Sequence, residues 1–175
     1  FQKGSITVRI LTYNHFESPV DGAMSLDFWC DRLTKARKMR TSLNLPSDGT
    51  DCYRLVHGEG DSLPGLIIDI YHRTAVIQAH SAGMYLSLEM ISKALQCCFG
   101  EDLCAIYDKS EGTAPYKAGL DLGDKYLWGD IGVDESVVCE NGNKFSVNWK
   151  EGQKTGFFLD QRDNRSLVGE YAKGR

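Results

Sequence analysis

Two apolar runs with only two residues between them constrain the fold of this chain more than any other feature. The runs are Leu66–Tyr71 and Thr74–Ala79, and His72 and Arg73 connect them. Short apolar runs rich in β-branched residues are typical of buried strands. Because the connection is so short, the two strands must pair antiparallel. The sequence therefore predicts a β-hairpin at the centre of the chain.

Further strands and helices are expected on both sides of this hairpin. Strand patterns occur at Cys52–His57 and Leu103–Tyr107. Apolar residues recur at helical spacing over Ser25–Leu43, where Ser25 can cap the first turn, and over Gly83–Cys98. The prediction is an α/β (α+β) fold with a mixed β-sheet and packed helices. Its core is expected where the hairpin meets the second helix, around Leu66, Ile68, Val76 and Leu88.

The last part of the chain predicts a separate unit. Residues 108–134 are polar and rich in Gly and Asp, which indicates a long loop with one short element. Ser136–Glu140 and Lys144–Trp149 flank an Asn-Gly pair, a strong hairpin signal. Asp160–Tyr171 has a helical pattern with Asp160 as the expected N-cap. A β-hairpin and a terminal helix should therefore follow the sheet.

Charge and hydropathy exclude some classes of protein. The net charge is −4 and the pI is near 5.6, so the chain is not a strongly basic nucleic-acid binder. No apolar stretch is long enough to span a bilayer. Cations do line one face of the first predicted helix, where they could meet RNA phosphates or simply face solvent, and solvation is the favoured interpretation. These cations are Arg32, Lys35, Arg37, Lys38 and Arg40.

The cysteines and histidines do not show the spacing of a metal site. None of the six cysteines forms a C-x-x-C pair, and the four histidines are scattered. Each cysteine lies among apolar residues, so we expect small buried hydrophobes in a reducing cytoplasm. The cysteines are Cys30, Cys52, Cys97, Cys98, Cys104 and Cys139.

The densest polar cluster is the segment Glu151–Arg165, which follows a predicted strand and leads into a predicted helix. Such a turn aims backbone N–H groups at a ligand, so the segment could form one wall of a small-molecule site. A tight return with a capped helix and two core phenylalanines explains it equally well. The candidate ligand-binding residues are Gln153, Lys154, Thr155, Phe157 and Asp160.

This segment, EGQKTGFFLDQRDNR, resembles a signature of the RlmI-type methyltransferases. Those enzymes use S-adenosylmethionine (SAM) to methylate carbon-5 of cytosine in large-subunit ribosomal RNA. Four further stretches resemble the central domain of that family, so that the resemblance covers nearly the whole chain. They are Tyr53–Glu59, Leu63–Asp69, Ser81–Met84 and Ile106–Ser110. Residues 108–111 read Asp-Lys-Ser-Glu where many relatives have an acidic residue followed by Arg-Ser-Asp.

The resemblance implies a division of the chain and a set of partners. Residues 1–20 would be the end of an RNA-binding PUA domain and a linker, 21–135 the central domain, and 136–175 the entrance to the SAM-binding domain. The five candidate residues would then bind SAM, ribosomal RNA would be the partner, and a homodimer is a further option. The catalytic cysteine is expected beyond Arg175, so this fragment would be inactive alone. The alternative is a free-standing RNA-binding or scaffold module.

Overall fold

A five-stranded mixed sheet forms the centre of the molecule in the computed structural model, which describes residues 9–12, 24–115, 119–129, 132 and 135–174. Neighbouring strands are antiparallel except β3 and β4, which are parallel because α2 and α3 connect them. In spatial order the strands are β1 (Cys52–His57), β2 (Leu66–Tyr71), β3 (Thr74–Ala79), β4 (Ala105–Asp108) and β5 (Lys125–Trp128).

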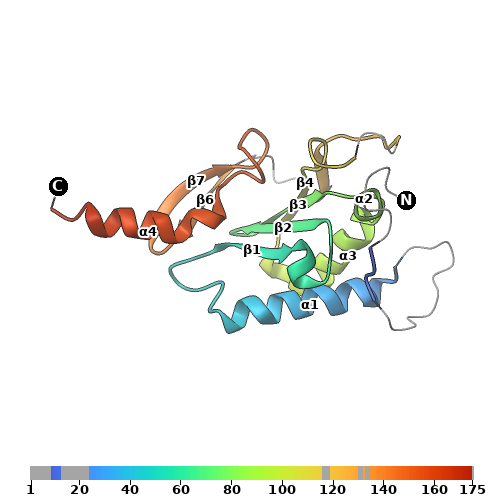
Figure 1. Cartoon of the computed structure of the whole chain (residues 1–175), viewed down its shortest axis with the longest axis horizontal. Coiled ribbons are helices and arrows are strands. Elements are labelled where there is room, and N and C mark those ends of the chain that lie inside the picture. The colour runs from blue at the N-terminus through green and yellow to red at the C-terminus, as the bar shows by residue number, and fades with distance from the viewer. Residues whose placement is uncertain (1–8, 13–23, 116–118, 130–131, 133–134, 175) are drawn as a thin grey trace.

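Two helices cover one face of this sheet, which we call the helix-covered face. They are α1 (Leu26–Ser42) and α3 (Leu88–Phe99), which pack against each other below the strands (Figure 1). The short α2 (Ala82–Leu86) precedes α3. The side chains that fill this core are apolar, and Leu33, Leu55 and Ile91 are fully buried in it. Burial of apolar area is therefore the main stabilising contribution on this side.

A hairpin covers the opposite face of the sheet, which we call the hairpin-covered face. It consists of β6 (Glu135–Glu140) and β7 (Asn143–Asn148). The hairpin and the residue after it contribute Val138, Val147 and Trp149 to a second buried cluster, which also contains residues of the central sheet. The hairpin is a two-stranded sheet of its own, as predicted, and it shares a core with the central sheet.

The chain ends in α4 (Arg162–Tyr171), which projects away from the sheet (Figure 1). A 3₁₀ turn, η4 (Leu159–Gln161), leads into it, and no residue of α4 is buried. Two other 3₁₀ turns, η1 (Gly58–Asp61) and η2 (Gly100–Asp102), connect elements of the sheet layer. Among the described residues, no helix has the length and apolar character needed to cross a membrane.

Most predicted elements are confirmed. β1, β2 and β3 have the predicted bounds, and Ser25 caps α1 by accepting a hydrogen bond from the Phe28 backbone at 3.2 Å. Asn141 and Gly142 both have positive φ, at 50° and 79°, as the twist of a two-residue hairpin requires. The fold is the predicted mixed α/β arrangement.

Other predictions need correction. The expected helix Gly83–Cys98 is broken at Ser87 into α2 and α3. Asp160 is not the N-cap of the last helix, since it lies inside η4 and Gln161 takes the cap position without a side-chain bond. Val76 is buried but lies on the hairpin-covered face, because side chains alternate along β3 and its neighbour Ile77 faces the helices.

The pattern of alternating apolar residues over Ser5–Thr12 predicts a further strand, which falls mostly outside the described residues, as does most of the range 1–20 assigned to a PUA domain. The described part, residues 9–12, is not a strand. Its Leu11 packs against the first core, and the Leu11 carbonyl accepts a hydrogen bond from Arg32 at 2.9 Å. The division into domains stays a prediction.

Candidate functional site

A buried polar network joins the centre of the sheet to the Glu151–Arg165 segment. Asp69 on β2 is fully buried, and its two carboxylate oxygens accept hydrogen bonds from Arg54 on β1 at 2.8 and 2.9 Å. Thr155 is also fully buried and donates its hydroxyl to Asp69 at 2.6 Å. This three-residue arrangement neutralises a carboxylate that would otherwise be costly to bury.

Tyr71 completes the network from the end of β2. Its hydroxyl lies 2.7 Å from the Thr155 hydroxyl. Because Thr155 uses its single hydrogen for Asp69, Tyr71 must donate to Thr155. Burial, reinforced by the negative charge of Asp69, raises the pKa of Tyr71. The phenol therefore keeps the proton that this bond requires.

Two more side chains of the sheet hold the backbone of the loop after β7. The Lys109 ammonium donates to the carbonyls of Trp149 and Gly152, and Gln78 donates to the carbonyl of Lys154 at 3.2 Å. The loop is wound so tightly that a Cβ on Gly152 would lie 2.3 Å from the Asn148 carbonyl oxygen. Only glycine fits there, so the loop has one well-defined conformation.

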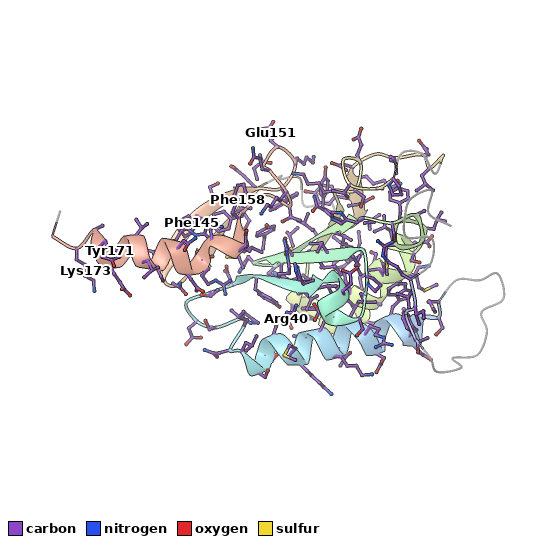
Figure 2. All side chains as sticks on the ribbon, viewed as in Figure 1. Arg40, Phe145, Glu151, Phe158, Tyr171 and Lys173 are labelled. Atoms are coloured by element: carbon purple, nitrogen blue, oxygen red, sulfur yellow. The ribbon has the colours of Figure 1, made fainter. Side chains whose placement is uncertain are left out.

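The outer side of this loop is polar and open to solvent. Gln153, Lys154 and Asp160 are all exposed. The Lys154 ammonium lies 3.3 Å from both carboxylate oxygens of Asp160 and 4.6 Å from the centre of the Phe158 ring. Its hydrogen bond lowers the pKa of Asp160. Phe158 is 39% exposed and lies close to the start of α4 (Figure 2).

The structure thus brings the five candidate residues together but divides them by orientation. Thr155 points inward, and its hydroxyl is already bonded. Phe157 is half-buried, with its ring centre 5.2 Å from that of Phe145 and 4.3 Å from the Arg165 guanidinium. Gln153, Lys154 and Asp160 remain available to a ligand. The binding role of the five residues stays a prediction. Within it, Thr155 and Phe157 would support the loop from its buried side rather than contact the ligand.

The base of α4 is fixed by a second buried carboxylate. Glu140 at the end of β6 is 2% exposed and accepts hydrogen bonds from Arg165 at 2.7 and 2.8 Å and from Arg162 at 3.4 Å. Arg162 also donates to the Cys52 carbonyl on β1 at 2.6 Å. Hydrogen bonds from one guanidinium group to both oxygens of a carboxylate are among the strongest hydrogen bonds in proteins. They fix the first turns of α4 against both the hairpin and the sheet.

The sequence-based search missed Arg54, Asp69 and Lys109, although one signal was present. Asp69 interrupts an otherwise apolar strand, and a carboxylate in such a position must find a partner when it is buried. The partner Thr155 lies 86 residues further along the chain. No local pattern could have identified it.

The basic face of α1 is largely used within the molecule. Arg40 binds Asp61 at 2.5 and 2.7 Å and lies between α1 and the strands (Figure 2). Arg37 binds Asp102 at 2.6 Å, and Arg32 binds the Leu11 carbonyl. Lys35 pairs with Asp31 along the helix at 2.7 Å, and Lys38 is exposed. This favours an intramolecular role for the three arginines, and RNA contact by the strip stays a prediction.

The six cysteines are free thiols and differ in their surroundings. Burial raises the pKa of Cys52 to about 12, and burial together with neighbouring Cys98 raises that of Cys30 to about 11. Both therefore remain protonated and weakly nucleophilic at neutral pH. Cys97 is exposed, so the expectation that every cysteine is buried is wrong. Within the described part of the chain, no three potential ligands cluster as a metal site would need.

Many known proteins have similar sequences, and the three described next are each named ribosomal RNA large subunit methyltransferase I. The protein of Pseudoalteromonas atlantica is 42% identical over 170 residues, which are 97% of this chain and 41% of that protein. The protein of Erwinia tasmaniensis is 39% identical over 155 residues, or 89% of this chain and 38% of that protein. The protein of Yersinia pseudotuberculosis is 36% identical over 173 residues, or 99% and 42% of the two chains. No family model matches.

Solved structures share the fold. A putative SAM-dependent methyltransferase from Streptococcus mutans matches 86% of this chain and 37% of its own, with a TM-score of 0.69 and 23% identity. A putative methyltransferase complexed with SAH gives the same TM-score and identity over 83% of this chain and 36% of its own. The chain spans about two fifths of the length of its curated relatives. The resemblance to RlmI-type methyltransferases is thereby confirmed over the part of those proteins that this chain spans.

Proposed function

We propose that this chain is part of a SAM-dependent methyltransferase that modifies carbon-5 of a cytosine in large-subunit ribosomal RNA. The observation that carries the proposal is 42% identity, over 97% of the chain, to a protein named ribosomal RNA large subunit methyltransferase I. The shared fold with a putative SAM-dependent methyltransferase supports it. The chain corresponds to two fifths of such a protein, so the activity belongs to the longer protein.

The exposed side of the Gln153–Asp160 loop has groups that fit SAM. The cofactor carries a charged amino-acid group, ribose hydroxyls and an aromatic base, and when bound it supplies an electrophilic methyl group. Lys154 and Asp160 offer one positive and one negative group, and Gln153 adds an amide. The partly exposed ring of Phe158 offers an aromatic surface. These four residues would hold one side of the cofactor.

The buried network gives the loop its shape before any ligand arrives. Asp69, Tyr71 and Lys109 fix the loop from the sheet side, so little backbone freedom remains to be lost on binding. Preorganisation of this kind strengthens binding because the entropic cost is already met in folding. The central sheet would therefore serve as a rigid support for the Gln153–Asp160 loop.

Methylation of cytosine carbon-5 also requires a nucleophile, since this carbon becomes reactive when a thiolate adds at the neighbouring ring carbon. Cys30 and Cys52 do not suit this role because their pKa values are raised to about 11 and about 12. As the resemblance to the family implies, we place the nucleophile on a cysteine of the longer protein, outside this chain. The residues of this chain would bind and orient the cofactor, while other parts of the longer protein would complete the reaction.

The proposal is tested with the full-length protein that contains this chain. The protein is incubated with SAM and unmodified large-subunit ribosomal RNA, and the RNA is digested to nucleosides and analysed by mass spectrometry. We expect 5-methylcytidine to appear only in the presence of both protein and SAM. A different methylated nucleoside would refute the cytosine assignment. A protein that transfers no methyl group, or that ends near Arg175, would favour the RNA-binding or scaffold module.

A pair of variants tests the cofactor edge in the same protein. Asp160→Ala should weaken SAM binding about tenfold, as expected for the loss of a charged hydrogen-bonding group, and should leave RNA affinity unchanged. Asp163→Ala is the matched control, because Asp163 is an exposed carboxylate in the first turn of α4. Calorimetry measures the cofactor affinity. Equal SAM affinity in both variants and the wild type would return the loop to a purely structural role.

A further inference from the structure

A concave surface lies on the helix side of the sheet, apart from the Gln153–Asp160 loop. It is a hollow of about 300 Å³ between the last turns of α1, the start of β1, the β2–β3 turn and η2. Its volume is at the lower end of the range for small-ligand sites, which is about 300–1,000 Å³. Every residue that lines it is among those described. A single ring system would fill it better than a large ligand.

The floor of the hollow is apolar and aromatic. Tyr53, Ile70 and Phe99 line it, and the guanidinium of Arg37 lies 4.4 Å from the centre of the Phe99 ring. The Tyr53 hydroxyl makes no hydrogen bond to another described residue, and burial raises its pKa, so it can both donate and accept. Flat arginine and aromatic groups of this kind are the surfaces on which proteins stack unpaired bases.

The rim carries both hydrogen-bond donors and acceptors. Arg73 is held at the rim by one bond from its Nη2 to the Glu101 carbonyl, at 2.6 Å, and makes no ion pair with any residue in the described ranges. Its other N–H groups have no partner in the described part of the chain and can bind a ligand. The carboxylates of Asp51 and Asp102 also line the hollow, where Asp51 contacts His72 at 3.0 Å and Asp102 binds Arg37.

This balance of charge distinguishes between two kinds of ligand. A phosphate would have to approach Asp51, Glu101 and Asp102, and their negative charges would oppose it. The edge of a nucleobase is neutral and has donors next to acceptors, which matches the mixed rim. The flat ring of the base matches the apolar and aromatic side chains of the floor.

We propose that this hollow binds one unstacked base of single-stranded RNA, which places an RNA contact on the opposite face of the sheet from the loop that carries the cofactor residues. The proposal rests on the proposed function for the identity of the nucleic acid. Arg73 would bind the edge of the base, the Tyr53 hydroxyl would bind it from the floor, and Arg37 would stack on its face. Of the α1 cations considered for RNA binding, Arg37 would thus act through its flat guanidinium, because Asp102 pairs with its charge.

The experiment uses the 175-residue chain and a short fluorescein-labelled single-stranded RNA of mixed sequence. The matched probe has the same length and backbone with abasic sites in place of the bases. Fluorescence anisotropy should show that the base-containing RNA binds at least about fivefold more tightly, as loss of a stacked base predicts. Equal affinity for the two probes, or no binding of either, would overturn the proposal.

Variants locate the contact on the molecule. Arg73→Ala should reduce affinity for the base-containing RNA about tenfold and change affinity for the abasic probe little. Tyr53→Phe keeps the ring and should give a smaller loss with the same preference. The control is Lys93→Ala, which removes an exposed cation of α3 that pairs with Glu89. Wild-type affinity in both Arg73→Ala and Tyr53→Phe, with folding checked by circular dichroism, would reject this site.

The outcome is separable from that of the proposed function. Methyl transfer by the full-length protein together with no base preference in this chain would reject the hollow alone. Absence of methyl transfer together with base-dependent binding that is lost in Arg73→Ala would keep the hollow and reject the enzyme.

Discussion

The two faces of the central sheet are held by different kinds of interaction. On the helix-covered face, apolar side chains from β1 to β4 meet α1 and α3. The hairpin-covered face also has an apolar cluster, but Arg54 and Asp69 lie beside it and bind a loop distant in sequence. The helix-covered face can accept other apolar side chains of similar total volume. The hairpin-covered face requires particular partners, and this is the face on which the candidate cofactor loop lies.

The largest expected effect is on the helix-covered face. Leu88 is 5% exposed in the first core, so Leu88→Ala should lower the free energy of unfolding by about 2–5 kcal/mol, through lost apolar burial and the cavity left behind. Leu86→Ala is the control, because Leu86 is 73% exposed two residues earlier. Urea unfolding gives both values. A change below about 0.5 kcal/mol for Leu88→Ala would place this residue at the surface.

A smaller effect is expected on the hairpin-covered face. Asp69→Asn removes the negative charge that pairs with Arg54 and leaves one amide N–H group facing the donors that Asp69 now accepts. We expect a loss of about 1–3 kcal/mol, the usual cost of an unsatisfied buried polar group. Amide hydrogen exchange should also become faster in the loop around Thr155. Unchanged exchange there would mean that the apolar cluster alone holds the loop, and the contrast between the faces would fail.

The same contrast decides how much of the structure could be predicted from sequence. The bounds of β1, β2 and β3 follow from local apolar patterns, and the Ser25 cap and the Asn-Gly turn follow from local backbone chemistry. The orientation of Val76 could not be predicted, because both faces of β3 are buried and its sequence therefore has no polar alternation. The break at Ser87 was also hidden, since apolar spacing continues through it.

The candidate site was predictable only in part for a related reason. The sequence identified the Gln153–Asp160 loop as polar and dense, and family resemblance suggested its ligand. It could not show that Thr155 points inward, because this orientation is set by Asp69 and Tyr71 on a strand 84 or more residues away. Long-range hydrogen bonds leave little trace in local periodicity.

Asp108 is the polar exception on the helix-covered side, two residues after Ile106 on β4. It is fully buried, its Oδ2 has no hydrogen-bond partner among the described residues, and burial raises its pKa to about 6. The folded protein therefore holds this proton more tightly than the unfolded chain does. Its contribution to stability is greatest below the unfolded pKa of 3.8 and falls as pH rises through about 6.

Asp108→Asn tests this exception. The variant should gain stability relative to the wild type between pH 5 and pH 7.5, by on the order of 1 kcal/mol. Urea unfolding at both pH values measures it, and Glu89→Gln, at an exposed carboxylate of α3, is the control. A difference between Asp108→Asn and wild type that stays constant with pH would show that Asp108 titrates normally.

The smallest perturbation is chemical and leaves the fold intact. Cys52 lies buried in the second cluster with its pKa raised to about 12, whereas Cys97 is exposed on α3. A water-soluble thiol reagent at neutral pH should therefore modify Cys97 and spare Cys52 until the protein is unfolded. Peptide mass mapping at successive times shows which of the two cysteines is modified first. Early modification of Cys52 would mean that the hairpin opens readily from the sheet.

The attachment of α4 has a mechanical consequence. Glu140 and its two arginines hold only the first turns of this ten-residue helix, while Tyr171 near its far end is 76% exposed (Figure 2). A helix of that length extends about 15 Å, so it acts as a lever that is held at its base by Glu140, the Cys52 carbonyl and the Asn141 side chain. A tilt of about 10° at Glu140 would move the far end by roughly 3 Å. Small changes in these contacts at the base therefore become larger displacements at the end of α4.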